Sequence, residues 1–148
     1  MRMAKMILLL LLLIVIGIQF IRPARNRQPG PFPADISQVY ALPSGVQQLL
    51  QQACYDCHSN QTHYPWYASV QPAGWFLQQH VSAGRRDLNF HEFAAYSAKR
   101  KQRKLKHMRE QLISGRMPPD SYKWLHPEAR LTTVQRDSVI RWIDSVLQ

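Results

Sequence analysis

The chain has 148 residues, a formal net charge of +10 at pH 7 and two cysteines. This length suits one domain with one hydrophobic core. Two cysteines are too few for a larger disulfide framework, which excludes the disulfide-rich class of small secreted domains.

The N-terminus combines a short basic segment with a long apolar run. Arg2 and Lys5 precede the run Met6–Ile21, which only Gln19 interrupts. This pattern is typical of a secretory signal, but no small-x-small cleavage site follows it. As a helix the run would measure about 24 Å, and snorkelling of flanking basic side chains would extend it toward a hydrocarbon core of roughly 30 Å. We therefore expect an uncleaved signal anchor, a single transmembrane helix, over residues 1–21.

A polar segment rich in proline follows the anchor. Its composition favours an extended linker over residues 22–36. One domain is then expected over residues 37–148. Seventeen of the nineteen Lys and Arg residues and all nine Asp and Glu residues lie beyond the anchor, which leaves this part of the chain with a net charge of about +8.

The first half of the domain shows helical patterns joined by loops. Ser44 offers an N-cap for a helix whose apolar stripe runs to Cys54. A second helix is expected at about residues 72–81. Asn89 can cap a third helix that starts at Phe90.

The second half continues with helices, and strand signals are weak throughout. A basic helix carries Leu105, Met108 and Leu112 on one face and ends at Gly115. The last helix begins at the capping-box spacing Thr132-x-x-Gln135. Its expected buried residues are Val139, Ile140, Ile143, Val146 and Leu147. The fold class is therefore mainly α.

The most informative motif is Cys54-Tyr55-Asp56-Cys57-His58. It has the C-x-x-C-H spacing at which two cysteine sulfurs bond to the vinyl groups of one haem. The adjacent histidine then becomes the proximal ligand of the iron. We therefore expect one covalent haem c, attached through Cys54 and Cys57, with His58 bound to the metal.

Three other interpretations of the motif remain open. A thioredoxin-like pair shares C-x-x-C but normally follows a strand in a βαβ unit, whereas the flanks here are helical. A structural zinc site needs four ligands, and the remaining histidines form no second compact pair. A chance disulfide loop is the third interpretation. The remaining histidines are His63, His80, His91, His107 and His126.

The motif also bears on location. Charge leaves the orientation of the anchor open, because basic residues flank both ends of the apolar run. Haem attachment at C-x-x-C-H implies an exported domain. We therefore expect a single-pass inner-membrane protein with its haem domain in the periplasm.

An electron carrier with low-spin iron needs a second axial ligand opposite His58. Met117 follows the helix terminator Gly115 and precedes two prolines that stiffen the loop. A thioether ligand raises the reduction potential relative to a second imidazole. Met117 is therefore the expected second metal ligand.

Three residues compete with Met117. His126 precedes Pro127 in a loop shortly after Met117 and is the stronger candidate for bis-histidine ligation. His80 lies on an aromatic helix, where packing or hydrogen bonding is the simpler role. Met108 lies on the apolar face of the basic helix and is expected in the core.

Further segments follow the haem motif in a characteristic order. Tyr64-Pro65-Trp66-Tyr67 comes first, then Met117-Pro118-Pro119, His126-Pro127 and Trp142. With these motifs, residues 34–148 resemble the haem-binding domain family of small c-type cytochromes from bacterial envelopes. The resemblance implies a cytochrome c-like helical domain with thioether links at both cysteines and axial ligation by His58 and Met117. It implies no substrate.

Aromatic residues cluster after the motif. Flat side chains suit the walls of a flat cofactor and exclude water from it, and a role as an electron path is the alternative. We expect these side chains to form the walls of the cofactor pocket. The candidate cofactor-binding residues are Tyr64, Trp66, Tyr67 and Trp75.

The strongest charge block lies in residues 99–109, where seven residues are Lys or Arg. Nucleic-acid binding does not fit an exported domain. Docking to anionic lipid, steering toward an acidic redox partner in the envelope, and a merely solvated helix face all remain open.

The expected function is that of a membrane-anchored cytochrome that carries single electrons and is not an enzyme. A haem-based sensor or a peroxidase-like protein, with a vacant or labile sixth ligand, is the alternative. A thiol protein without haem is a third possibility.

Overall fold

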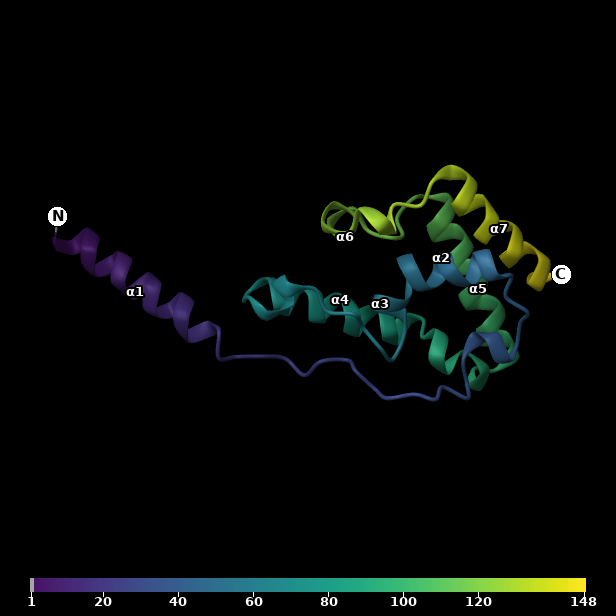
Figure 1. The fold of residues 1–148 in the computed structure, drawn as a ribbon, viewed down its shortest axis with the longest axis horizontal. Coiled ribbons are helices and arrows are strands. Elements are labelled where there is room, and N and C mark those ends of the chain that lie inside the picture. Colours follow the sequence, from purple (N-terminus) through teal and green to yellow (C-terminus); the bar gives the residue numbers. More distant parts are fainter. Residues whose placement is uncertain (1) are drawn as a thin grey trace.

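The computed structural model describes residues 2–148, and the fold is mainly α, as expected (Figure 1). Within these residues the β pairing is confined to an isolated antiparallel bridge between Arg27 and Gln61. The helices, with 3-10 helices labelled η, are α1 (Arg2–Ile18), η1 (Ile36–Gln38), α2 (Ser44–Ala53), α3 (Tyr55–His58), η2 (Trp66–Ser69), α4 (Ala73–Asp87), η3 (Phe90–Ala95), α5 (Ala98–Ile113), α6 (Asp120–Leu125), η4 (Pro127–Ala129) and α7 (Thr133–Leu147).

The hydrophobic core forms where α2, α5 and α7 pack together, and η1 and η3 close it. Helix α5 contributes one buried face, as its spacing predicts. Helix α7 buries Trp142 in addition to the expected Val139 and Ile143, while the other expected residues of α7 are partly buried. The main core residues are Ile36, Val46, Leu50, Phe90, Phe93, Leu105, Met108, Leu112, Val139, Trp142 and Ile143.

Local signals set several helix ends. The Thr132 side chain accepts a hydrogen bond from the backbone of Gln135, whose side chain accepts one from the backbone of Thr132, so the capping box is confirmed. Asn89 caps η3 by accepting from His91 N–H. Gly115 has φ +68°, the left-handed conformation that ends a helix.

Two helix boundaries differ from the expected ones. Ser44 is the first residue of α2, and Pro43 occupies the cap position without a side-chain hydrogen bond. Helix α4 runs on to Asp87, beyond the expected end near residue 81, so Gly84 lies inside it. A close approach of another backbone, described below, explains a glycine at that position.

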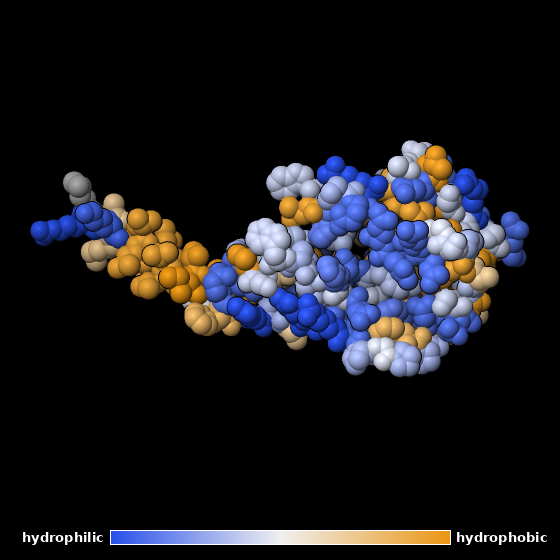
Figure 2. Space-filling model, viewed as in Figure 1, coloured by the Kyte–Doolittle hydropathy of each residue, from blue (hydrophilic) through white to orange (hydrophobic). Residues whose placement is uncertain are grey.

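Helix α1 projects from one end of the domain, and its apolar side chains are exposed (Figures 1 and 2). No helix among residues 2–148 combines the length and the apolar character needed to cross a membrane.

The segment expected as a linker is extended, but it packs on the domain. Gln28 N–H donates to the Asn60 carbonyl, and Thr62 N–H donates to the Asn26 carbonyl, each at 3.0 Å. Asn26 is buried, and Ile36 lies in the core. Residues 22–36 therefore contribute contacts to the domain, although their composition is that of a linker.

Candidate functional site

The C-x-x-C-H motif folds as a tight turn that consists of Cys54, which ends α2, and the four-residue helix α3 that follows it directly. The carbonyl of Cys54, at the end of α2, accepts hydrogen bonds from the backbone N–H groups of Cys57 (3.2 Å) and His58 (2.9 Å). Both cysteines are free and half-buried. The turn therefore gathers two thiols and one imidazole in one short segment.

Helix α4 holds His58 in one orientation. The Nδ1 atom of His58 lies 3.0 Å from the carbonyl oxygen of Leu88, the residue that ends α4. A carbonyl only accepts, so Nδ1 carries the proton and Nε2 keeps a lone pair for a metal. Burial lowers the pKa of His58, which keeps the ring in the neutral form that ligates metals. Metal-bound histidines are characteristically oriented by such a bond.

Helix α4 also approaches the turn closely at Gly84. A Cβ atom at this position would lie 2.6 Å from the carbonyl oxygen of Cys57. Only glycine permits this approach of one backbone to another. The contact sets the distance between the helix that orients His58 and the turn that carries it.

The two thiols are in an environment that suppresses ionisation. Burial, with a smaller effect of the Cys57 charge, raises the pKa of Cys54 to about 12. Burial, with a smaller effect of the Asp56 charge, raises the pKa of Cys57 to about 11. Catalytic thiols of disulfide oxidoreductases have lowered pKa values instead. These surroundings disfavour the thioredoxin-like interpretation.

The zinc interpretation gains no support. Within residues 2–148, no group of three or more His, Cys, Asp or Glu side chains is arranged to hold a metal ion. A structural zinc site requires four such ligands.

Two contacts hold the segment after Met117, one to the motif and one to η2. The Tyr122 hydroxyl donates to Asp56 Oδ2 at 2.8 Å, and the Tyr67 hydroxyl lies 2.7 Å from Nε2 of His126. The Tyr122 and His126 rings stack with centroids 4.1 Å apart. Helix α6 is thereby fixed beside the turn that carries the cysteines.

Met117 itself lies on the wall of an open cavity of about 410 Å³. The cavity is also lined by Trp124, Leu131 and Arg136, and no residue of the C-x-x-C-H motif lines it. Met117 is 41% exposed. Its role as an iron ligand therefore stays a prediction.

The competing ligands are engaged elsewhere. Both ring nitrogens of His126 have partners, because Nδ1 lies 2.9 Å from Glu128 Oε1 and Nε2 lies beside Tyr67. His80 is exposed, with Nδ1 2.8 Å from the Phe76 carbonyl of its own helix. Met108 lies in the core, as expected.

The predicted aromatic residues differ in their surroundings. The Tyr64 hydroxyl accepts from Asn26 N–H and donates to Gln78 Oε1, each at 2.7 Å. The indole N–H of Trp75 donates to a backbone carbonyl at the end of the apolar N-terminal segment. Trp66 lies on the surface. That these residues and Tyr67 form the walls of a haem pocket stays a prediction.

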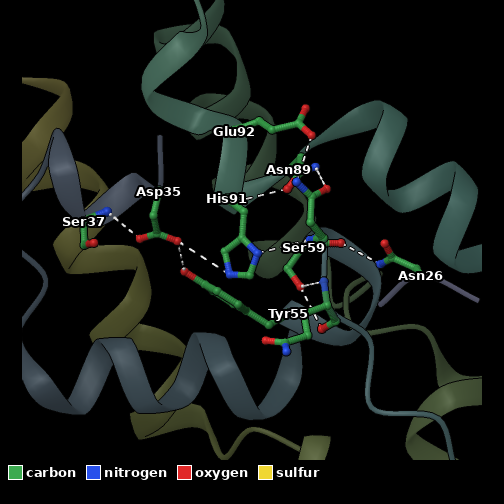
Figure 3. A network of polar contacts seen from close by, with 10 residues as sticks. Asn26, Asp35, Ser37, Tyr55, Ser59, Asn89, His91 and Glu92 are labelled. Atoms are coloured by element: carbon green, nitrogen blue, oxygen red, sulfur yellow. Dashed lines mark hydrogen bonds and ion pairs between the residues drawn. The ribbon is translucent and has the colours of Figure 1, made fainter. Parts of the chain in front are cut away.

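Sequence reasoning missed a polar network that ties the expected linker to the motif (Figure 3). Asp35 accepts a hydrogen bond from the Tyr55 hydroxyl at 3.2 Å, and its carboxylate lies 3.9 Å from His91 Nε2. His91 Nδ1 accepts from Asn60 N–H at 3.2 Å, and its ring stacks on Phe32 with centroids 3.6 Å apart. The partners are far apart in sequence, so no local pattern pairs them.

Comparison with known proteins identifies the family. The model of the haem-binding domain family matches residues 13–145, which include the whole C-x-x-C-H turn and Met117. No curated protein and no solved structure gives a match. Because the family match spans most of the sequence, the chain belongs to the haem-binding domain family.

Proposed function

We propose that this haem-binding protein is a c-type cytochrome that carries single electrons through one covalently attached haem. The observation that carries the proposal is the contact between His58 Nδ1 and the Leu88 carbonyl, which orients a neutral imidazole beside two protonated thiols. This donor set fits a haem c, because the cofactor takes two thiols and one imidazole nitrogen with a free lone pair.

Each residue of the turn has a defined role in this proposal. Cys54 and Cys57 would hold the haem through thioether bonds between their sulfurs and its two vinyl groups, and His58 would ligate the iron through Nε2. When bound, the haem supplies a one-electron ferric–ferrous couple. The Gly84 contact and the Leu88 carbonyl keep the imidazole in a fixed position, which limits reorganisation of the ligand when the oxidation state changes.

Met117 is the proposed second axial ligand. The left-handed Gly115 ends α5 just before it, and Pro118 and Pro119 restrict the backbone after it. The hydrogen bonds of Tyr122 and His126 hold the following helix beside the motif. These contacts would support a loop that offers the Met117 thioether to the iron as its second protein ligand.

One observation favours a second candidate function. Met117 is partly exposed and lines a cavity away from the motif. A thioether that leaves the iron readily would open a site for a gas or a peroxide, as in a haem sensor or a peroxidase-like protein. In the cytochrome proposal the thioether stays bound, and the protein is a carrier rather than an enzyme.

The proposal includes attachment to the inner membrane through residues 1–21, with the haem domain in the periplasm. Support comes from the exposed apolar side chains of α1, since such a surface is rare on monomeric soluble proteins (Figure 2). The 17 residues of α1 measure about 25 Å along the helix axis, and Lys5 and Arg22 flank the apolar run.

The proposed partner is an acidic redox protein of the envelope. On α5, Lys104 pairs with Asp87, Arg109 pairs with Asp144, and Arg100 lies over the ring of Tyr96. Four further basic residues of α5 have no acidic partner in the described part of the chain, and they would attract an acidic surface. They are Lys99, Lys101, Arg103 and Lys106.

Acid–acetone extraction and optical spectra of the purified full chain test the proposal. Haem that stays with the protein through acid–acetone extraction supports covalent attachment, and its complete loss refutes it. A low-spin ferric spectrum with the weak far-red band of thioether ligation supports Met117. A high-spin spectrum that shifts with carbon monoxide favours the sensor or peroxidase-like alternative.

A further inference from the structure

The end of the apolar N-terminal segment is fastened to one edge of the domain. The Gln19 side chain donates to the Gln71 carbonyl at 3.2 Å and accepts from Gln71 N–H at 2.9 Å. The Trp75 indole N–H donates to the Ile21 carbonyl at 2.8 Å. These bonds place the end of the segment directly beside the start of α4.

The same edge carries large exposed apolar side chains. Trp66 is 82% exposed, Phe76 is 63% exposed and Val70 is 46% exposed. We call these three residues the aromatic shelf. Phe20, at the end of the N-terminal segment, is 82% exposed as well. Because the shelf lies within residues 66–76, it adjoins the residues that hold the N-terminal segment.

We propose that the aromatic shelf rests in the lipid interface of the membrane, next to the point where the N-terminal segment enters it. The inference rests on the proposed anchoring through residues 1–21. Trp and other aromatic side chains prefer the level of the lipid headgroups, where one part of the ring is apolar and the other is wet. Apolar surface of this kind, continuous with a membrane segment, gains free energy by burial in the interface.

Charge supports lipid as the occupant rather than a second protein. Arg22 and Arg25 are exposed beside the shelf, and the Arg25 guanidinium donates to Ser69 Oγ at 2.7 Å. Basic side chains near an inserted segment attract anionic headgroups. Figure 1 shows the start of α4 on the side of the domain from which α1 emerges, with α2, α5 and α7 on the far side.

This placement gives α4 a second role. Its first residue, Ala73, adjoins the shelf, while Gly84 contacts the haem-binding turn and Leu88 orients His58. The helix between Ala73 and Gly84 is about 16 Å long, so α4 acts as a rigid spacer between lipid and haem. The basic helix α5 is then left facing away from the membrane, available to a soluble partner.

Photocrosslinking to lipid tests the placement of the shelf. The full chain is reconstituted into vesicles of phosphatidylethanolamine and phosphatidylglycerol that contain a phospholipid with a diazirine near the ester end of one acyl chain. After illumination, mass spectrometry locates the lipid adducts. We expect adducts in residues 66–76 as well as in residues 1–21, and none in α7. Adducts in residues 1–21 alone overturn the inference and leave the anchor proposal intact, whereas adducts in neither segment overturn both.

Matched substitutions separate the shelf from other exposed apolar residues. Trp66→Ser with Phe76→Ser should remove most adducts from residues 66–76 and leave those in residues 1–21. Ile113→Ser and Val134→Ser, at residues that are also exposed, should change neither. Unchanged labelling of residues 66–76 after the shelf substitutions contradicts the inference. If the haem spectrum changes at the same time, the result assigns Trp66 to the haem instead.

Discussion

The Tyr122 hydroxyl donates a hydrogen bond of 2.8 Å to Asp56, a residue inside the C-x-x-C-H motif. The other carboxylate oxygen of Asp56 accepts from His63 N–H at 2.9 Å. Burial and the nearby Asp56 charge raise the pKa of Tyr122, so the hydroxyl remains a donor. This pair links the helix after Met117 to the turn that carries the C-x-x-C-H motif.

Tyr122→Phe should weaken that link. We expect a loss of about 1–2 kcal/mol in the free energy of unfolding, because Asp56 loses a donor that is partly shielded from water. The far-red band of thioether ligation should weaken as well, because the Met117 loop loses its tie to the motif. Denaturant titration of the holoprotein and absorption spectra measure the two effects.

Tyr40→Phe is the matched control for this substitution. The Tyr40 ring packs edge-on against Phe93, and its hydroxyl has no hydrogen-bond partner in residues 2–148. This variant should keep both the stability and the spectrum. Equal effects of the two substitutions would contradict a specific role of the Tyr122 hydroxyl.

Gly84→Ala should disrupt the turn that carries the C-x-x-C-H motif. The added Cβ would meet the Cys57 carbonyl at 2.6 Å, so α4 must move away from α3 and carry the Leu88 carbonyl with it. We expect a loss of about 3 kcal/mol in the free energy of unfolding and a lower yield of holoprotein. Denaturant titration and the haem content per chain measure both.

Gly45→Ala provides the comparison for Gly84→Ala. Gly45 lies in α2, and a Cβ there meets nothing within 4 Å. Replacing glycine in a helix by alanine should stabilise the protein by up to about 1 kcal/mol. If Gly84→Ala proves as harmless as Gly45→Ala, the close approach of α4 does not constrain the site.

The C-x-x-C-H motif and two of the helix ends were predictable because their signals are local. The Thr132–Gln135 capping box and the left-handed Gly115 each depend on residues within one turn of helix. The C-x-x-C-H motif likewise carries its chemistry within five residues.

The contacts that orient the site were not predictable in the same way. The bond between His58 and Leu88 and the approach of Gly84 to Cys57 each join residues about 30 positions apart, and a backbone carbonyl accepts from any residue type. The burial of Ile36 was not predictable from local sequence either. This residue is fully buried because η1 packs on η3, whereas the proline-rich composition around it predicts a linker.

Met117→Ala should open the sixth coordination site and lower the reduction potential, since a thioether ligand raises it. Stability should change little, because the side chain is partly exposed. Carbon monoxide binding and a redox titration measure the change. Met108→Ala is the control, since this core residue should cost about 2–5 kcal/mol of stability without altering the spectrum. An unaltered spectrum in Met117→Ala would transfer the ligand role to His126 or His80.

In the haem-free chain, both cysteines should react slowly with alkylating reagents near neutral pH. Only the thiolate attacks such reagents, and burial raises the pKa of Cys57 to about 11 and that of Cys54 to about 12. The thiols therefore stay protonated below these values, and the alkylation rate should rise about tenfold per pH unit until the pKa is approached. Stopped-time alkylation followed by mass spectrometry gives the rates. Rapid alkylation near neutral pH in the folded chain would contradict the buried environment of the thiols and revive the thioredoxin-like interpretation.

Charge reversal on α5 should slow electron exchange with an anionic reagent. Lys104, on this helix, pairs with Asp87 at the end of α4, and the next residue, Leu88, orients His58, so α5 lies beside the candidate site. Arg103→Glu removes one of the unpaired basic side chains, and oxidation of the reduced protein by ferricyanide should become several-fold slower at low ionic strength. The effect should fade as salt screens the charges. Arg141→Glu, on α7, makes the same change in net charge at an exposed residue whose hydrogen bond goes to Ser138. If both variants slow the reaction equally, the net charge of the protein rather than the surface of α5 governs the encounter.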